Sequence, residues 1–240
     1  MKIIVDVKHF QMKFGDKEVI KDLSFDVKKG EIFGLLGANG SGKTTTIRAL
    51  LGFYRPTAGE VLVDGKVYNP ENSSVRIGYL PEERGLYRKE TVLDTMVYFG
   101  ELNGLKDSAE WSKKYLKRVG LEDKINERIE KLSGGQQQKV QLGITIMGDP
   151  QLLILDEPTK GFDPMNRRLL MEIIEEHHKK GAAIIMITHY MDEVEKLCDR
   201  ALLLKDGVAR AYGSISEIKK EFKNKSLEQI FVDVYGGENE

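Results

Sequence analysis

Apolar and polar residues follow regular patterns along the 240-residue chain. Residues 2–10 and 19–27 alternate between the two kinds, which is typical of paired β-strands with one buried face. Short apolar runs bounded by turn residues predict further strands, in chain order at residues 31–37, 60–65, 76–81, 151–158 and 182–189. These segments indicate the strands of an α/β core.

Helical spacing replaces the alternation in the middle of the chain. Residues 91–104 and 108–120 each carry apolar side chains on one helical face. Asp163 followed by Pro164 predicts the start of a later helix, because aspartate caps helices and proline fits their first turn. We therefore predict an all-helical insertion within an α/β domain: a core at residues 1–81 and 150–225, the insertion at 82–149, and a short tail at 226–240.

The composition narrows the class of protein. With 37 basic and 38 acidic residues, the chain has no general positive field, so no nucleic-acid partner is expected. Cys198 is the only cysteine, which rules out an intrachain disulfide and suits a reducing compartment. The N-terminus has no secretory signal pattern, and every apolar run is far shorter than the ~20 residues of a spanning helix. We expect any membrane role to depend on a partner.

A glycine-rich loop follows one of the predicted strands and precedes a helical pattern. It fits G-x-x-x-x-G-K-[ST], in which backbone N–H groups surround phosphate oxygens and the helix adds its positive end. Lys43 is expected to reach the β- and γ-phosphates, and the Thr44 hydroxyl to bind Mg²⁺. The loop supplies the first candidate nucleotide-binding residues: Gly37, Ala38, Asn39, Gly40, Ser41, Gly42, Lys43 and Thr44.

Two adjacent carboxylates end the apolar run at residues 151–158. A charge at the end of a buried strand is costly unless it holds a metal ion or a water. We expect Asp156 to bind Mg²⁺ through water and Glu157 to polarise an attacking water. The alternative is a strand-ending turn with two solvated acids.

A second anion-friendly loop, LSGGQ, occupies Leu132–Gln136. Ser133 is a suitable N-cap for the helix that follows, and the two glycines expose backbone N–H groups at its positive end. The candidate residues for this second anion site are Ser133, Gly134, Gly135 and Gln136. A single triphosphate does not need both loops, because Lys43 is already expected to bind at its γ-phosphate.

Together the two loops make the sequence resemble the ATP-binding cassette of ABC transporters, whose signature is LSGGQ. The resemblance spans residue 3 to about residue 233, and "PEERGLY" is similar to the ABC-2-type branch that extrudes sodium and drugs. It implies a P-loop NTPase core with an N-terminal antiparallel β-subdomain and an inserted helical signature subdomain. It also implies ATP and Mg²⁺ as ligands and a head-to-tail pair of cassettes, each P-loop facing the other's signature.

The resemblance implies further residues and partners. Phe14 would stack on adenine, Thr45 would bind nucleotide, and His189 would contact the γ-phosphate; residues 160–163 would form the loop after the catalytic acid. Phe14 could instead be a core strand residue, and His189 purely structural. The implied partner is a separate transmembrane permease that holds the cassette at the cytoplasmic face of the cell membrane, with export the expected direction. Whether the pair is a homodimer or a heterodimer stays open.

One position departs from the family pattern. Glu82 stands where the family usually has a glutamine that contacts Mg²⁺ and links the core to the insertion. Glutamate can still bind Mg²⁺, but its charge beside a triphosphate would weaken nucleotide binding or raise the Mg²⁺ requirement.

Other candidates have competing interpretations. Leu86 and Tyr87 suit either a docking site for the permease or packing beneath the insertion, and His177 and His178 are expected at a solvated helix end. Two alternative functions are a soluble ABC ATPase outside transport and a regulatory cassette with little turnover. The absence of a long coiled coil or a cysteine cluster argues against the first, and the presence of Glu157 argues against the second.

Overall fold

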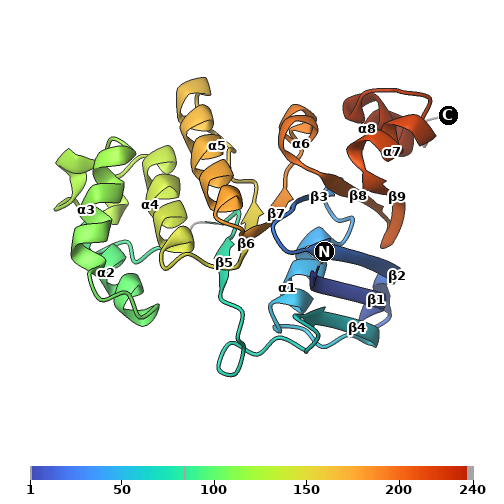
Figure 1. The fold of residues 1–240 in the computed structure, drawn as a ribbon, viewed down its shortest axis with the longest axis horizontal. Helices are drawn as coiled ribbons and strands as arrows, with labels where there is room; N and C mark the ends of the chain where they lie inside the picture. Colours follow the sequence, from blue (N-terminus) through green and yellow to red (C-terminus); the bar gives the residue numbers. More distant parts are fainter. Residues whose placement is uncertain (1, 84, 237–240) are drawn as a thin grey trace.

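The computed structural model describes residues 2–83 and 85–236. Its strands form one sheet in the order β4-β1-β2-β9-β8-β3-β7-β6-β5 (Figure 1). The strands are β1 Ile3–Phe14, β2 Lys17–Lys28, β3 Ile32–Leu36, β4 Ala58–Val63, β5 Ile77–Leu80, β6 Leu152–Asp156, β7 Ala183–Ile187, β8 Arg200–Lys205 and β9 Val208–Ser214. The helices are α1 Lys43–Leu50, α2 Val92–Leu102, α3 Ser108–Arg118, α4 Gly134–Ile146, α5 Pro164–Lys179, α6 Met191–Leu197, α7 Ile215–Glu221 and α8 Leu227–Gly236, with short 3₁₀ turns at Glu122–Lys124 and Ile129–Lys131.

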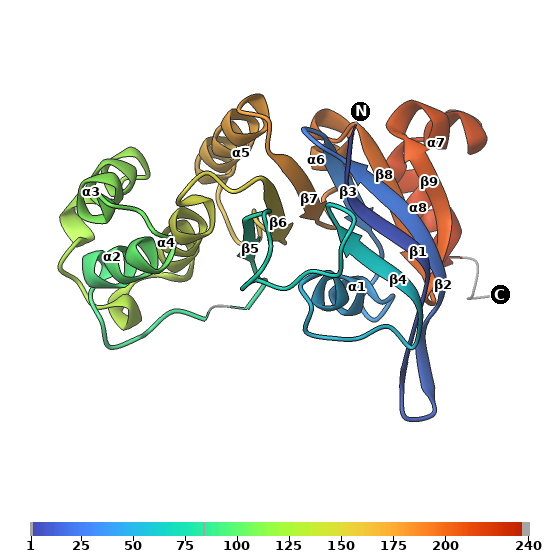
Figure 2. The same ribbon diagram turned by 60° about the horizontal axis from the view of Figure 1, so that its bottom comes forward.

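The sheet has an antiparallel part and a parallel part, which confirms the predicted α/β fold with an N-terminal antiparallel unit. β4, β1 and β2 pair antiparallel, whereas β8, β3, β7, β6 and β5 run parallel. β9 joins the two parts, antiparallel to β8 and parallel to β2. In Figure 2 the hairpin of β1 and β2 extends well beyond the rest of the sheet.

The parallel strands are buried on both faces. Every residue of β3, β6 and β7 is buried, and successive side chains enter two different hydrophobic clusters. Leu153 and Leu155 join the cluster that contains α2 to α6, whereas Leu152 and Ile154 join the one beneath α1 and the antiparallel strands. This two-sided burial explains the continuous apolar runs in the sequence.

Helices α2, α3 and α4 lie at the opposite end of the molecule from the antiparallel strands (Figure 1). Their apolar faces nevertheless join the same hydrophobic cluster as α5 and one face of β6 and β7. The Tyr115 ring of α3 stacks on Trp111, and its hydroxyl donates to the Lys139 carbonyl of α4 at 2.7 Å. The helical segment therefore packs as a continuation of the core.

The helix starts agree with the sequence. Ser133 caps α4 in a capping box: its hydroxyl accepts the Gln136 N–H, and the Gln136 side chain accepts the Ser133 N–H at 2.8 Å. Asp163 caps α5 and accepts the Asn166 N–H at 2.9 Å, with Pro164 as the first helical residue.

Three features of the structure go beyond the sequence-based expectations or contradict them. Strands β8 and β9 were not predicted, although both belong to the sheet. Residues 227–236 of the expected tail form helix α8, which buries Leu227 and Ile230; residues 237–240 lie outside the described residues. The expectation that α5 ends in solvent is wrong for His177. This side chain is buried, and desolvation lowers its pKa. The neighbouring His178 ring forms a hydrogen bond with the Gly30 carbonyl.

Gly143 provides a test of the packing of α4. A methyl group there would lie 2.4 Å from the Tyr115 ring, whose hydroxyl is fixed to Lys139. Although alanine favours helices by about 1 kcal/mol over glycine, we expect Gly143→Ala to lower the free energy of unfolding by about 1–3 kcal/mol. Urea unfolding measures this change. Gly236→Ala is the matched control, since among the described residues its methyl would meet Val232 at an ordinary 3.6 Å. Equal or greater stability of Gly143→Ala would contradict the packing.

Candidate functional site

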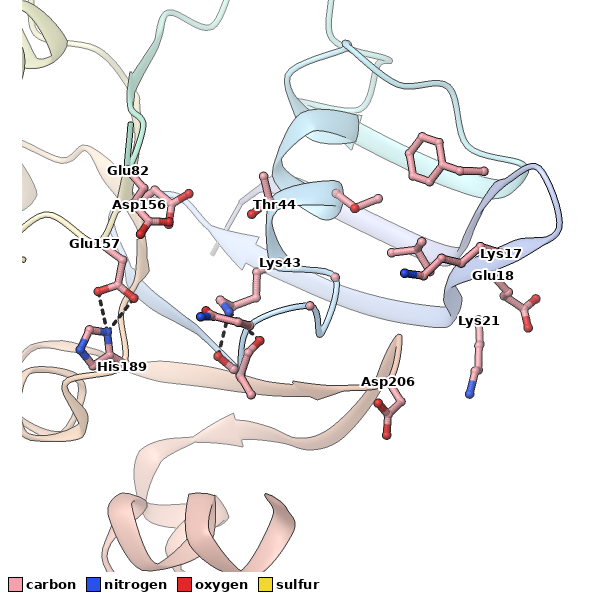
Figure 3. Close-up of a pocket in the computed structure, with 18 of the residues that line it drawn as sticks. Lys17, Glu18, Lys21, Lys43, Thr44, Glu82, Asp156, Glu157, His189 and Asp206 are labelled. Atoms are coloured by element: carbon pink, nitrogen blue, oxygen red, sulfur yellow. Dashed lines mark hydrogen bonds and ion pairs between the residues drawn. The ribbon is translucent and has the colours of Figure 1, made fainter. Parts of the chain in front are cut away.

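A cavity of about 950 Å³ opens where the parallel strands end, beside the start of α1 (Figure 3). Its volume suits a ligand of nucleotide size. Many of the candidate site residues predicted from the sequence line it: Phe14, Gly37, Ala38, Asn39, Gly40, Gly42, Lys43, Thr44, Thr45, Glu82, Asp156, Glu157 and His189. Ser41 is buried beneath the loop, and the four LSGGQ candidates do not line the cavity.

The glycine-rich loop folds tightly around the Lys43 side chain. The Lys43 ammonium donates to the carbonyl oxygens of Gly37 at 2.8 Å and Ala38 at 3.0 Å (Figure 3). Burial lowers the pKa of Lys43, while the neighbouring carboxylates act in the opposite direction. Gly42 has φ +111°, and a methyl group there would lie 2.3 Å from Ile20, so only glycine fits. The loop thus delivers one cation and the N-terminus of α1 to the cavity.

Three carboxylates gather opposite this cation. Asp156 ends β6 and is only 7% exposed; burial and the charges of Glu82 and Glu157 raise its pKa to about 6, whereas Lys43 favours its ionised form. Glu82 pairs with Lys160 at 2.6 Å, and this pair is half-exposed. Lys160 was expected only as part of a loop; its pairing with Glu82, 78 residues away, was not predicted.

This carboxylate set suits a divalent cation that also has phosphate ligands. Within residues 2–83 and 85–236, no three His, Cys, Asp or Glu side chains group closely enough to hold a metal ion by themselves. Mg²⁺ characteristically takes one or two carboxylates and completes its shell with waters and substrate phosphates. The hard oxygen donors of Thr44 and Asp156 fit that preference.

Glu157 is held in a strained backbone conformation. Its φ is +49°, in the left-handed region that non-glycine residues rarely adopt. Its N–H donates to the Ile187 carbonyl at 2.8 Å, and the Gln138 amide donates to its carbonyl oxygen at 3.2 Å and to that of Pro158 at 2.9 Å. These contacts from β7 and α4 stabilise the strained turn and aim the Glu157 carboxylate into the cavity.

His189 completes this side of the cavity. Its Nδ1 lies 2.9 Å from each oxygen of the Glu157 carboxylate (Figure 3). The Tyr190 ring packs beside the imidazole at 4.2 Å, and Arg167 lies 4.5 Å from the centroid of that Tyr190 ring. The histidine and the glutamate are therefore in direct contact, although 32 residues separate them in sequence.

Phe14 lines the cavity from the end of β1. It is 45% exposed and makes an edge contact with the Tyr54 ring, with centroids 5.2 Å apart. It is therefore no core residue, and an exposed aromatic ring in a polar cavity can stack on a planar ligand.

The LSGGQ loop does not line this cavity. Ser133 is exposed at the N-terminus of α4, and its hydroxyl, which accepts an intrahelical bond, keeps its proton free to donate. A methyl group on Gly135 would lie 3.3 Å from the Phe162 ring, so the second glycine packs against the loop after Glu157.

Gln138 and Phe231 are among the side chains at the site that were not predicted from the sequence. Gln138 lies on α4 only two residues after the signature, but helical spacing alone does not indicate that it binds the Glu157 turn. Phe231 of α8 lines the cavity from a segment more than 180 residues away from the glycine-rich loop. Neither contact has a local sequence signal.

The fold and the cavity define a P-loop nucleotide-binding protein. The ABC transporter family matches residues 20–160, more than half of the chain. An uncharacterised ABC transporter ATP-binding protein of Methanocaldococcus jannaschii is 46% identical over 220 residues, 91% of this chain and 80% of its own. A solved ATP-binding subunit of an ABC transporter superposes with a TM-score of 0.88 at 30% identity, covering 96% of this chain and 98% of its own. The chain therefore belongs to the ABC transporter family as an ATP-binding, ATP-hydrolysing subunit.

Some relatives have names that state a function. The Nod factor export ATP-binding protein I of Rhizobium sp. is 38% identical over 96% of this chain and 77% of its own length. The linearmycin resistance ATP-binding protein of Bacillus subtilis is 34% identical over 95% of this chain and 75% of its own.

Throughout the described part of this chain, we find no helix with the length and apolar character needed to span a bilayer.

The raised pKa of Asp156 predicts a pH-dependent cost to stability. Because the folded-state pKa of about 6 exceeds the ordinary 3.8, the contribution of Asp156 to stability falls as pH rises through this interval. We expect Asp156→Asn to raise the free energy of unfolding of the nucleotide-free protein by about 1–3 kcal/mol near pH 8, and by much less near pH 4. Urea unfolding at both pH values measures this, with exposed Asp16→Asn as control. A gain independent of pH would contradict the assignment.

Proposed function

We propose that this chain is the motor subunit of an exporter, in which two cassettes close on two Mg-ATP molecules and reopen after hydrolysis. The observation that carries the proposal is the joint placement of Lys43, Asp156 and the Glu157–His189 pair around one cavity. Phosphoryl transfer to water requires a cation that binds the phosphates, a carboxylate that binds the metal ion, and a second, fixed carboxylate that positions the attacking water.

The nucleotide would lie along the cavity from Phe14 to His189. Phe14 would stack on the adenine, and the backbone N–H groups of the glycine-rich loop would surround the phosphates. Lys43, which already contacts two loop carbonyls, would turn its remaining N–H toward the β- and γ-phosphates. Thr45 would also bind the nucleotide, from the first turn of α1.

The metal site would use Thr44, Asp156 and Glu82. Bound Mg²⁺ would neutralise phosphate charge and orient the γ-phosphate for attack. The hydroxyl of Thr44 and the carboxylate of Asp156 line the cavity together with Glu82. The Lys160 ammonium at 2.6 Å offsets the extra charge of Glu82, which supports retained nucleotide binding despite the departure from glutamine.

Glu157 would act as the general base and His189 as its orienting partner. The carboxylate would accept a proton from the attacking water, a contribution of roughly 10²- to 10⁴-fold in rate. The pinned backbone of Glu157 and the His189 contact at 2.9 Å support this role, because a base must hold its position to be effective. His189 would also contact the γ-phosphate from the Glu157 side.

The LSGGQ loop would serve the nucleotide of a second cassette. Ser133, Gly134, Gly135 and Gln136 do not line the cavity of their own chain, yet the exposed N-terminus of α4 is an anion site that lacks a use within one chain. In a two-fold pair each signature would face the other P-loop. Residues 82–149 would then form the signature subdomain, beside the core at 1–81 and 150–225.

A transmembrane permease would dock on the helical subdomain and hold the chain at the cytoplasmic face of the membrane. Tyr87 is 54% exposed, stacks on Phe99 and lines a shallow hollow of about 360 Å³ with Tyr98, whereas Leu86 is partly buried against the core. The two expected interpretations thus apply to different residues: Leu86 packs inward and Tyr87 faces out. Exposed aromatic rings beside a hollow suit an apolar helix of a partner.

Export is the proposed direction. The named relatives serve Nod factor export and linearmycin resistance, which supports an export role for this chain.

Glu157→Gln is the first test of the motor function. We expect the variant to keep ATP binding and lose hydrolysis by about 10²- to 10⁴-fold, because glutamine cannot accept the proton from water. With hydrolysis blocked, Mg-ATP should convert the monomer into a dimer. Phosphate release and mass in solution measure both effects, and exposed Glu101→Gln is the matched control.

Either half of that result can contradict the proposal. Turnover above a few per cent of wild type would mean that another base acts. ATP binding without a mass change would contradict closure by this chain with itself and would point to a different cassette or to the permease.

The Glu82–Lys160 pair predicts opposite effects of its two members. We expect Glu82→Gln to strengthen Mg²⁺-free ATP binding and Lys160→Ser to weaken it, each by about two- to fivefold, because half-exposed charges interact weakly. Fluorescent nucleotide titrations with and without Mg²⁺ measure the effect, and the double variant should fall between the two. An unchanged ratio of Mg²⁺-bound to Mg²⁺-free affinity in Glu82→Gln would show that Glu82 does not act at the metal site.

A further inference from the structure

Helix α8 returns to the glycine-rich loop from the C-terminal end of the described chain. The hydroxyl of Tyr235 accepts a hydrogen bond from the Ala38 N–H at 2.9 Å and donates to the Leu204 carbonyl at the end of β8. Ala38 and Tyr235 are 197 residues apart. The hydroxyl therefore bridges the start of the loop to the sheet.

Tyr235 and Lys43 both form hydrogen bonds with the same peptide group of the loop. The Ala38 N–H and the Gly37 carbonyl belong to the same planar peptide. The N–H binds Tyr235, and the carbonyl oxygen accepts from the Lys43 ammonium at 2.8 Å. Because both polar groups are bound, rotating this peptide would break two hydrogen bonds at once. The orientation of the peptide therefore depends on the tyrosine, and so does the position of the Lys43 ammonium that binds its carbonyl oxygen.

Helix α8 is itself firmly attached. Leu227 and Ile230 are buried in the core, and the Leu227 N–H donates to Glu195 at 2.7 Å. Near Tyr235, the Lys205 ammonium donates to the Val234 carbonyl at 3.0 Å and lies 5.6 Å from the centre of the tyrosine ring. These anchors leave the hydroxyl little freedom, so it can act as a fixed point for a loop that is rich in glycine.

The same helix also reaches the cavity directly. Phe231, one helical turn before Tyr235, lines the cavity, and the two rings lie 4.6 Å apart. Helix α8 thus supports the glycine-rich loop from behind and forms part of the wall beside it.

We propose that Tyr235 is a positioning residue for nucleotide binding: its hydroxyl fixes the Gly37–Ala38 peptide and thereby the Lys43 ammonium. The proposal rests on the function proposed above. It makes the C-terminal helix part of the ATP site, although this helix carries no recognised nucleotide-binding motif. It also means that a displacement of α8 would be felt as a change in nucleotide affinity.

Tyr235→Phe tests the hydroxyl without removing the ring. The Ala38 N–H and the Leu204 carbonyl would each lose a partner, and one such bond is worth about 1 kcal/mol. We expect the Kd for ATP and for ADP to rise about fivefold, KM to rise in step, and kcat to change less than twofold, as for uniform binding. Val232→Ala is the control on the exposed side of α8 and should match wild type.

A purely structural role gives a different result. If Tyr235→Phe lowers the melting temperature but leaves Kd and KM within twofold of wild type, the proposal is wrong. Amide hydrogen exchange of Ala38 in the wild-type protein is a second measurement that does not require the variant to fold. Protection of this amide in the nucleotide-free protein is expected, and exchange at the rate of a free loop would also overturn the proposal.

Lys43→Ala separates this inference from the proposed function. If wild type binds ATP and Lys43→Ala does not, the nucleotide site is established and only Tyr235 remains in question. If wild type and Lys43→Ala bind equally poorly, the proposed function itself fails.

Discussion

Parallel pairing of β3, β7 and β6 is the constraint on which the site depends. Each of these strands is five residues long and buried on both faces, so their order and register are fixed by packing against two hydrophobic clusters. Leu35 and Asp156 both pair with Ile187. The strands therefore end together, and the segments that follow them, which contain Lys43, Glu157 and His189, must meet at one edge of the sheet.

The chemistry at that edge is unfavourable for the folded chain alone. Asp156 is buried beside two other carboxylates, which raises its pKa to about 6, and Glu157 has a left-handed backbone conformation. Strained residues and crowded like charges persist only where surrounding contacts hold them, and they concentrate at functional sites. Here the contacts come from Lys43, from the Glu82–Lys160 pair and from the hydrogen bonds of Gln138. A bound cation would relieve the repulsion among these carboxylates.

These supporting contacts connect the site to both ends of the molecule. Gln138 lies on α4, the helix that begins at the LSGGQ loop, and it binds the backbone of Glu157. Tyr235 lies on α8 and binds the backbone of Ala38. Glu157 and the glycine-rich loop are thus each attached to a helix outside the parallel core. Movement of either helix would act on backbone groups of the site, which is a direct route for coupling between nucleotide and distant surfaces.

The sequence by itself determined the features that depend on local pattern. The glycine-rich loop, the two carboxylates after a buried strand and the capped LSGGQ helix are contiguous segments whose chemistry follows from residue type and spacing. Together with the alternation of apolar residues, they were enough to predict the α/β fold, the helical segment, and the loop and carboxylate residues of the cavity. Phe14, Thr45, Glu82 and His189 were implied only by the family resemblance. The helix caps at Ser133 and Asp163 were equally predictable, because a cap involves only four neighbouring residues.

The tertiary structure alone decided which distant residues meet. The contacts between Glu82 and Lys160, Gln138 and Glu157, and Ala38 and Tyr235 join residues far apart in the chain, and none has a repeating or local signature. The burial of His177 escaped prediction for a related reason, since neighbours from other segments determine it. Strands β8 and β9, by contrast, form a local hairpin across Asp206 and Gly207, so the sequence contained a signal for them that the prediction missed. A hydrogen bond requires its two atoms to lie within about 3 Å of each other. Only the packing of the whole chain fixes positions to that accuracy.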